Sequence, residues 1–334
     1  STMGSWGKLP SPDTEPGHSS VFQRMNTPAS PLYSFLGPRY WPVWLGLGLL
    51  RASLWLPFSA RLAVGRGLGR LSMWLMPRRR RIAAKNLALC FPDMSAASRE
   101  ALLAEHFESL GIALIETAMC WWSSDREIRR LLRVEGLENL QAATEEGRGV
   151  IMLTGHFTPL DLGGRFVTML APVAAVYRPH KNRLFDEIVR RGRERSARET
   201  IPKQDVRAII RALRRKRAVW FAPDQSHRRR HSAVVPFFGV PAPTNTATSN
   251  FARMSGAPVV PFIPVRLPES RGYKLLIMPA LEGFPGQDPA EDAARINRLL
   301  ENEIRKNPAQ YLWVHRRFKP ADPDSVDHYA ELSP

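Results

Sequence analysis

Apolar and polar positions alternate in blocks along the second half of the chain, and the blocks predict strands and helices in turn. Five short apolar runs have the length of buried strands, at residues 150–154, 173–177, 218–222, 258–265 and 273–278. Helix periodicity or helix start signals lie between and after them, from residue 159, at 183–196, at 205–217 and from residue 288. Strands separated by helices predict an α/β fold with a mostly parallel central sheet flanked by helices.

Two helical segments are predicted before residue 150. Residues 99–122 carry apolar side chains at the spacing of an amphipathic helix, and Ser95 is a candidate cap for it. Residues 41–58 are eighteen mostly apolar residues with three tryptophans, interrupted by Arg51 and closed by Pro57. As a helix they are about 27 Å long, just short of the roughly 30 Å hydrocarbon core of a bilayer. A spanning helix and an anchor lying in the membrane interface both fit this segment.

Composition and charge divide the chain further. The first 36 residues are rich in Pro, Ser, Gly and Thr and are predicted to be a disordered lead or an expression remnant. Residues 37–60 are predicted to form the membrane-anchor helix, and 61–334 a single domain. Arginines follow the anchor directly, at positions 61, 66, 70 and 78–81. By the positive-inside rule they place the single domain on the cytoplasmic side of the membrane.

A histidine and a carboxylate follow the first of the predicted strands. His156 comes directly after the apolar run, and Asp161 lies five residues further on. Thr158 is predicted to cap a helix that begins at Pro159, which puts Asp161 in its first turn and beside the imidazole. Held in this way, His156 can take a proton from a hydroxyl, so the pair predicts acid/base catalysis. The alternative is a simple capping box beside a hydrogen-bonded loop histidine.

The net charge of +17 and the pI near 10.8 predict an anionic partner. Residues 181–230 contain seventeen Lys or Arg and six Asp or Glu, so they carry +11 of this charge. Solvated helix faces, a phospholipid surface, a phosphorylated substrate and an acidic protein all fit it. Nucleic acid is not expected, because the sequence contains no zinc spacing, no aromatic ribonucleoprotein signature and no helix-turn-helix. No metal site is predicted either, since His227 and His231 have no neighbouring cysteine or paired carboxylate.

The spacing His156-x4-Asp161 after an apolar strand resembles the signature of the glycerolipid acyltransferase superfamily. Further stretches resemble the late acyltransferases of lipid A synthesis, most of all the lauroyltransferase branch. They run in order through residues 38–41 with 44–46, 80–92, 177–179, 222–225, 235–239, 252–257, 260–262 and 315–319. The resemblance implies that 61–334 is a single acyltransferase domain at the inner membrane.

The resemblance also implies which residues bind substrate. Arg178, at the end of a predicted strand, matches an arginine that contacts the acceptor; a surface salt bridge is the alternative. The other residues assigned to the acceptor or oxyanion are Asn182, Asp224 and Gln225. Where relatives continue with an acidic residue, an aromatic and a glycine, this chain has the basic run 226–231. A basic rim for phosphate or lipid is therefore predicted from Arg228, Arg229, Arg230, Arg316 and Arg317.

The reaction implied is acyl transfer from a thioester to a hydroxyl. The donor is an acyl carrier protein charged with a saturated chain of about twelve carbons, hydroxylated or not. A channel selects the length of this chain, and each CH2 group that it buries contributes about 0.8 kcal/mol to binding. The acceptor is a lipid A precursor, and no cofactor is implied. The oxyanion donors are Arg178 or backbone amides near Thr158. Two other functions remain open: an acyltransferase acting on a lysophospholipid or aminolipid, and a catalytically silent membrane scaffold.

Overall fold

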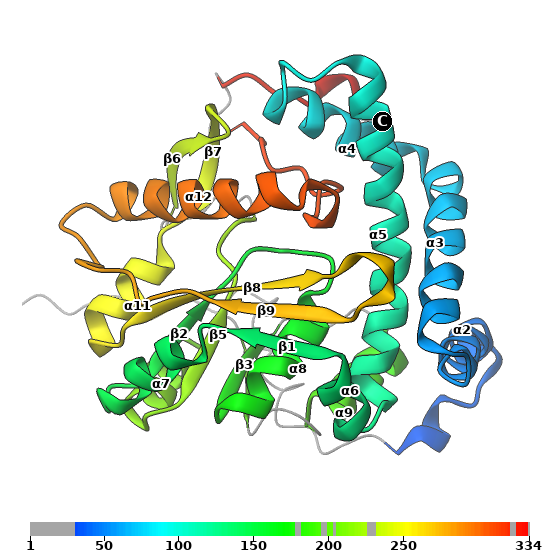
Figure 1. Ribbon diagram of the computed structural model, residues 1–334, viewed down its shortest axis with the longest axis horizontal. Coiled ribbons are helices and arrows are strands. Elements are labelled where there is room, and N and C mark those ends of the chain that lie inside the picture. The colour runs from blue at the N-terminus through cyan, green and yellow to red at the C-terminus, as the bar shows by residue number, and fades with distance from the viewer. Residues whose placement is uncertain are drawn as a thin grey trace, which may run out of the picture.

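A seven-stranded sheet forms the centre of the protein in a computed structural model (Figure 1). The structure describes residues 31–177, 182–194, 199–202, 205–225, 232–320 and 325–332. The strands are β1 (Leu132–Glu135), β2 (Val150–Leu153), β3 (Val173–Tyr177), β4 (Glu199–Pro202), β5 (Ala218–Phe221), β8 (Val259–Arg266) and β9 (Tyr273–Ile277). Their order is β1-β9-β8-β2-β5-β3-β4, and every pairing is parallel except β8 with β9. The predicted α/β fold with a mostly parallel sheet is confirmed.

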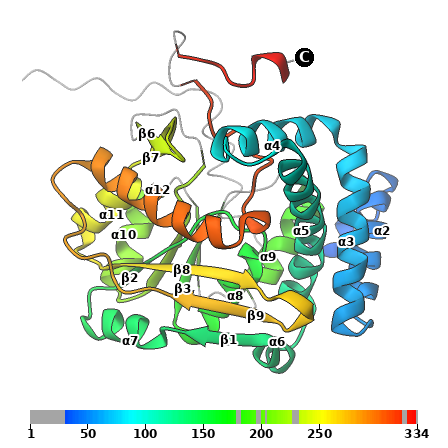
Figure 2. The ribbon, with the colours of Figure 1, turned by 45° about the horizontal axis from the view of Figure 1, so that its top comes forward.

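The helices lie on both faces of this sheet and along one side of it (Figures 1 and 2). They are α2 (Trp41–Ser53), α3 (Phe58–Leu75), α4 (Pro77–Cys90), α5 (Ala96–Trp122), α6 (Asp125–Leu131), α7 (Leu137–Glu145), α8 (Leu160–Leu170), α9 (Arg183–Glu194), α10 (Val206–Arg214), α11 (Ala247–Ser255) and α12 (Pro289–Lys306). All predicted helices are present within a few residues of their expected bounds, except the one at 41–58.

Strand β2 divides the core into two halves, as the alternation of side chains in a strand requires. Ile151 and Leu153 pack in a cluster with residues of α10, α11 and α12. Val150 and Met152 pack in a second cluster with residues of α7 and α8. Because helices cover both faces, the strand is apolar at every position, which is why its sequence reads as a continuous apolar run.

Four short strands were missed in the sequence, and so were several helices, among them α7 and α11. Strand β1 has four residues with alternating burial, and β4 lies at the other edge of the sheet. The hairpin of β6 (Ser232–Phe237) and β7 (Val240–Asn245) forms a separate two-stranded sheet. Its turn places Phe238 at φ 51° and Gly239 at φ 76°, which is an unusual conformation for a phenylalanine. No Asn-Gly or Asp-Gly pair marks this turn, so the usual sequence signal is missing.

The long helix α5 stands beside the sheet and separates it from α2 and α3 (Figure 1). Ser95 caps α5 as predicted, because its Oγ accepts a hydrogen bond from Ser98 N at 3.1 Å. Helix α3 approaches α5 very closely: a Cβ on Gly111 would lie 2.1 Å from the carbonyl oxygen of Gly65 and 2.2 Å from Gly69 N. Glycine at these positions is therefore required for the two backbones to meet.

The single helix predicted over 41–58 is wrong. Helix α2 ends at Ser53, and α3 begins at Phe58 directly after Pro57, whose ring disfavours helical conformation in the residue before it. Among the residues that the structure describes, no helix is both long enough and apolar enough to cross a membrane. The inner face of α2 is covered, since Leu47 belongs to a buried cluster with residues of α5 and α9.

Candidate active site

The fold brings the ends of β2 and β5 together at one edge of the sheet. The two strands are parallel neighbours, with Leu153 opposite Phe221, and Thr154 N donates a hydrogen bond to Phe221 O at 3.1 Å. His156 follows β2 and Asp224 follows β5, each by three residues. Because parallel strands end at the same edge, these two side chains meet although 68 positions separate them in the chain.

His156 and Asp224 form a hydrogen-bonded pair. Imidazole Nδ1 lies 2.6 Å from Asp224 Oδ1, and the backbone N–H of His156 donates to Oδ2 at 2.8 Å. The hydroxyl of Tyr311 also donates to Oδ2, at 2.9 Å. An ionised carboxylate only accepts, so Nδ1 carries the proton and Nε2 is the nitrogen that can take one. The Asp224 side chain is fully buried, whereas that of His156 is 24% exposed and within reach of a substrate.

The pKa values of the pair move apart. Burial opposes the charged form of His156, but the charge and hydrogen bond of Asp224, together with the charge of Asp161, outweigh burial and raise the pKa of His156 above 6.5. Burial likewise opposes ionisation of Asp224, but His156 and Tyr311 outweigh it and lower the pKa of Asp224 to about 2. The pair therefore combines a carboxylate that is ionised at neutral pH with a histidine of raised pKa.

The sequence predicted that Asp161 would hold the imidazole. In the structure, Asp224 occupies Nδ1 instead. Asp161 does lie in the first turn of α8, and Thr117 Oγ1 donates to its carboxylate at 3.3 Å. Its charge still raises the pKa of His156. Asp224, which the resemblance assigned to the acceptor, is instead fully buried and bonded to the imidazole, and Asp161 adds negative charge nearby.

The prediction that Thr158 caps α8 is also wrong. Helix α8 begins at Leu160 after Pro159, with no side-chain cap. The backbone amides near this point are already used: Phe157 N donates to Gly155 O at 2.9 Å, and Thr158 N donates to Gln310 O at 2.7 Å. These two N–H groups are not free to stabilise an oxyanion, so the predicted amide donors are narrowed to those of the first turn of α8.

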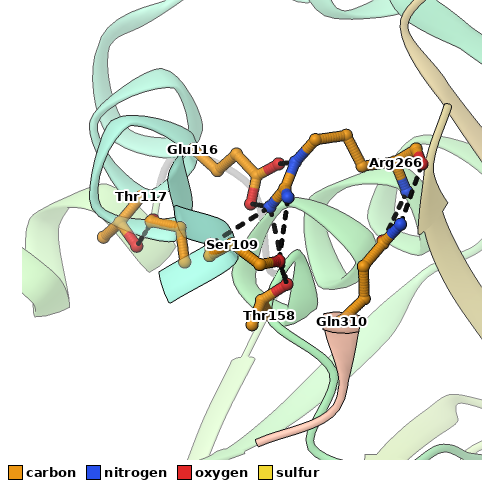
Figure 3. Close-up of polar contacts among 7 residues, drawn as sticks. Ser109, Glu116, Thr117, Thr158, Arg266 and Gln310 are labelled. Atoms are coloured by element: carbon orange, nitrogen blue, oxygen red, sulfur yellow. Dashed lines mark hydrogen bonds and ion pairs between the residues drawn. The ribbon is translucent and has the colours of Figure 1, made fainter. Parts of the chain in front are cut away.

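The side chain of Thr158 instead joins a buried polar network (Figure 3). Arg266, the last residue of β8, donates from Nε and Nη2 to both carboxylate oxygens of Glu116 at 2.6 and 2.9 Å, and from Nη1 to Ser109 Oγ at 2.9 Å. Ser109 Oγ lies 2.7 Å from Thr158 Oγ1. The side-chain amide of Gln310 bonds both backbone groups of Arg266, at 2.8 and 2.9 Å. The network therefore fixes both Thr158 and Gln310.

A segment near the C-terminus completes the site. Phe157 forms an isolated antiparallel bridge with Tyr311, and Leu312 N donates to His156 O at 2.9 Å. Asn86 of α4 holds the same segment by donating to the carbonyl oxygens of Trp313 and His315 at 2.6 and 2.8 Å. Sequence reasoning missed this segment and Tyr311. The alternation of aromatic residues at 311 and 313 before the basic run was the available signal.

The other predicted site residues are distributed differently. Asn182 is exposed, and its Oδ1 accepts from Phe185 N at 3.0 Å, which makes it the cap of α9. Gln225 is half-buried beside Asp224. Arg178 and the basic residues 228–230 lie outside the described residues, as do His227 and His231.

Arg317 does not belong to a basic rim, because its side chain is buried. It donates to Pro243 O and Thr244 Oγ1, each at 2.7 Å, and its guanidinium lies over the ring of Phe237. Arg316 is half-buried and donates to a backbone carbonyl of the C-terminal tail at 3.2 Å. The predicted rim is thus contradicted at Arg317.

His315 adds no positive charge at neutral pH. Burial lowers its pKa to about 4, although the charge of Asp224 acts in the opposite direction.

The protein is thus an α/β fold with a hydrogen-bonded His156–Asp224 pair at the carboxyl edge of its parallel strands. The family model described as bacterial lipid A biosynthesis acyltransferase matches residues 31–320, and the chain belongs to this family. It is therefore an acyltransferase.

Relatives with assigned acyl chains resemble the chain to different degrees. The lipid A biosynthesis palmitoleoyltransferase of Escherichia coli (strain K12) is 44% identical over 289 residues, 85% of this chain and 93% of that protein. The lauroyltransferase of the same strain is 41% identical over 287 residues, 86% of this chain and 94% of that protein. The myristoyltransferase is 27% identical over 298 residues, 89% and 92% of the two chains. The chain is thus more similar to the first two than to the third.

A solved structure, the 1-acyl-sn-glycerophosphate acyltransferase from Thermotoga maritima, aligns with a TM-score of 0.34 and 15% identity, over 70% of this chain and 98% of that chain. A likeness of this size carries no argument about fold or function.

Proposed function

We propose that the protein transfers a saturated, lauroyl-length acyl chain, hydroxylated or not, from acyl carrier protein to a hydroxyl of a lipid A precursor during lipopolysaccharide synthesis. The His156–Asp224 pair carries the proposal, because it supplies a base of raised pKa at the sheet edge of a lipid A acyltransferase. The lauroyl length rests on similarity to the lauroyltransferase, which is 41% identical, and the palmitoleoyltransferase, at 44%, makes a palmitoleoyl donor the second candidate.

The proposed reaction is a direct transfer. Nε2 of His156 removes the proton from the acceptor hydroxyl as its oxygen attacks the thioester carbonyl. The C–S bond breaks as the ester C–O bond forms, and the imidazolium returns the proton to the carrier thiolate. Asp224 stabilises the imidazolium at Nδ1. In this proposal, Arg178 stabilises the oxyanion or binds a phosphate of the acceptor. Gln225 contacts the acceptor.

The charge of the chain supports anionic partners. Acyl carrier protein and a phosphorylated lipid are both anionic, and the chain carries a net charge of +17. Arg228, Arg229 and Arg230 lie close in sequence to Asp224, so we assign them to the acceptor headgroup or to phospholipid. No cofactor is part of the proposal.

We further propose that the enzyme acts at the cytoplasmic face of the inner membrane. Helices α2 and α3 lie on the side of α5 away from the sheet (Figure 1), and they and their link expose large apolar side chains. This N-terminal apolar surface consists of Trp41, Leu45, Leu49, Trp55, Leu71, Trp74, Leu75 and Met76. Tryptophans at a lipid-facing rim, followed by arginines, are typical of a helix pair that lies in a membrane interface.

Mass spectrometry of the lipid products tests the acyl transfer. The purified protein is incubated with lauroyl-charged or palmitoleoyl-charged carrier protein and a tetraacylated disaccharide precursor. We expect the mass of one lauroyl group to be added, and the gain to be absent from His156→Ala. His328→Ala is the matched control, because His328 lies on the C-terminal tail and contacts Phe318 rather than the pair.

Each other result has a defined meaning. A mass gain seen only with the palmitoleoyl donor would mean that the donor chain is palmitoleoyl rather than lauroyl, and the proposed mechanism would stand. A gain only with lysophosphatidic acid or an aminolipid as acceptor would assign a different acceptor. Full activity of His156→Ala would contradict the proposed base. A protein inactive with every donor and acceptor, yet bound to membranes, would instead fit a scaffold.

Binding to phosphatidylethanolamine and phosphatidylglycerol vesicles tests the membrane surface. We expect Trp55→Ser combined with Trp74→Ser to weaken vesicle partitioning at least about tenfold, since each buried large side chain contributes on the order of 2 kcal/mol. The two residues are 86% and 78% exposed in the structure. Val326→Ser is the control, because Val326 is 72% exposed on the C-terminal tail. Equal partitioning of the two variants would sink the proposed surface.

A further inference from the structure

Tyr311 reaches the catalytic pair from outside the sheet. Its hydroxyl donates to Asp224 Oδ2 at 2.9 Å, the same oxygen that accepts the backbone N–H of His156, while Oδ1 is left for the imidazole. The tyrosine is only 4% exposed, so it is shielded from solvent and from substrate. Its hydroxyl can act on the reaction only through Asp224.

The position of this hydroxyl is set by ring packing. The Tyr311 ring lies with its centroid 5.9 Å from Phe157, 5.9 Å from Phe237 and 4.9 Å from Trp313. Its backbone is bridged to Phe157, directly after the catalytic histidine. The hydroxyl therefore stays aimed at the carboxylate whether or not the histidine is protonated.

We propose that Tyr311 is a positioning residue for the acyl transfer, whose hydroxyl limits how strongly Asp224 holds the proton of His156. This rests on the proposed function, in which His156 is the general base. A carboxylate that accepts from several donors spreads its charge among them, and each donor is then held less tightly. A base works best when its proton affinity is close to the working pH, so an unrestrained Asp224 would make His156 too basic.

The other described charges near the pair leave His156 as the titrating group around neutral pH. Asp161 of α8 faces it as an anion. His315 is neutral, because burial lowers its pKa to about 4. Cys90 of α4 keeps its proton, because burial raises the pKa of its thiol. The remaining groups that act on this cluster are the cations Arg317 and Lys319. Loss of one tyrosine hydroxyl leaves all of these groups in place.

Tyr311→Phe tests the role while keeping the ring. We expect the pH at which His156 is half-protonated to rise by about 0.5 to 1 unit, because the carboxylate loses one donor and pulls harder on the imidazolium. Two measurements follow this change: an NMR titration of the imidazole, assigned with His156→Ala, and the acid limb of the kcat/KM profile. Both should move to higher pH together.

Tyr329→Phe is the matched control. Tyr329 is also buried and near the C-terminus, but its hydroxyl donates to Asn86 Oδ1 at 2.5 Å and accepts from Phe318 N at 3.1 Å. This change loosens the same C-terminal region without touching Asp224. We expect its pH profile to match that of the wild type. Should Tyr311→Phe fold poorly, 3-fluorotyrosine at residue 311 keeps the ring and strengthens the donor, so the acid limb should move to lower pH.

The outcomes separate this inference from the proposed function. An NMR midpoint that stays unchanged in Tyr311→Phe, or shifts equally in Tyr329→Phe, overturns the inference and leaves His156 as the base. An NMR shift without a shift in the rate profile overturns His156 as the base, and the positioning role with it. Parallel shifts in Tyr311→Phe alone support both.

Discussion

Two charged pairs hold the two ends of the segment from His156 to Thr158, and they differ in what they are able to do. His156 and Asp224 are 2.6 Å apart, with the histidine side chain 24% exposed and Nε2 available for a proton. Arg266 and Glu116 are also 2.6 Å apart at their closest, but both are buried and bonded through two oxygens. The first pair can gain and lose a proton, and the second keeps its charges.

The choice of residue types explains the difference. Histidine titrates near neutral pH, so a neighbouring carboxylate and partial burial can tune it for catalysis. Arginine stays charged in proteins, and its fork matches a carboxylate with two hydrogen bonds. A buried pair of this second kind is well suited to hold the backbone, since any break leaves an uncompensated charge in the interior. One pair can thus exchange a proton, and the other fixes the loop on which His156 lies.

The largest expected effect comes from Asp224→Asn. An amide can present its NH2 group to Nδ1 and favour the wrong tautomer, so kcat should fall by about 10³ to 10⁴, as removal of the orienting carboxylate does in other histidine-based sites. Initial rates with acyl carrier protein and lipid precursor measure the loss.

Asp161→Asn is the matched control for that change, because its carboxylate adds charge without occupying Nδ1. We expect a smaller loss than for Asp224→Asn. An equal or larger loss would return the orienting role to Asp161 and contradict the assignment made from the geometry.

Glu116→Gln should act on stability more than on chemistry. It leaves the guanidinium of Arg266 buried without a counter-charge, so the free energy of unfolding should fall by about 3 to 5 kcal/mol. At denaturant concentrations below the unfolding transition, kcat of Glu116→Gln should differ from that of the wild type by less than about tenfold. Denaturant unfolding followed by fluorescence measures the first quantity.

Two further variants sharpen that prediction. Glu100→Gln breaks the exposed pair with Arg80 and should cost less than about 1 kcal/mol. Replacing Glu116 by Leu and Arg266 by Met together should recover most of the stability lost in Glu116→Gln, because no charge is then left unpaired. A double variant as unstable as the single one would mean that the contacts to Ser109 and Thr158 matter more than the charge.

The pH dependence should distinguish the pairs as well. Since the pKa of His156 is raised, activity should decline as the pH falls through a midpoint above 6.5. The linked stability of this histidine is present below 6.5 and is lost as pH rises through its raised pKa. For Asp224, lowered to about 2, the contribution is present above 3.8 and is lost as pH falls toward 2. Glu116→Gln should leave the activity midpoint where it is, and a moved midpoint would show that the two pairs are coupled.

Within the buried network, the smallest expected effect is that of Thr158→Val. It removes the hydroxyl that joins the loop to Ser109, 2.7 Å away, and should lower the free energy of unfolding by about 1 kcal/mol. Ser109→Ala is a poorer test, because it takes the closer acceptor from Arg266, at 2.9 Å against 3.5 Å for Thr158 Oγ1. A hundredfold loss of kcat in Thr158→Val would mean that the network takes part in the chemistry directly.

The sequence predicted the elements that have a strong local signal. The apolar runs at 150–154 and 218–222 and the helix start at Asp288 with Pro289 all appear in the structure. Their signals are burial on both faces for the strands and a cap followed by proline for the helix. The helix at 41–58 was predicted too long, because its apolar run continues beyond Ser53, where α2 ends.

By itself, the sequence determined that His156 would lie at the carboxyl end of a buried strand in an α/β acyltransferase, because strand and loop are adjacent in the chain. Only the tertiary structure decided which carboxylate would orient it. Asp161 is near in sequence, but β2 and β5 are hydrogen-bonded neighbours, and their pairing places Asp224 on Nδ1. Tyr311 and the Arg266–Glu116 network likewise depend on contacts across the chain. Local patterns specify elements, whereas the pairing of distant elements specifies the site.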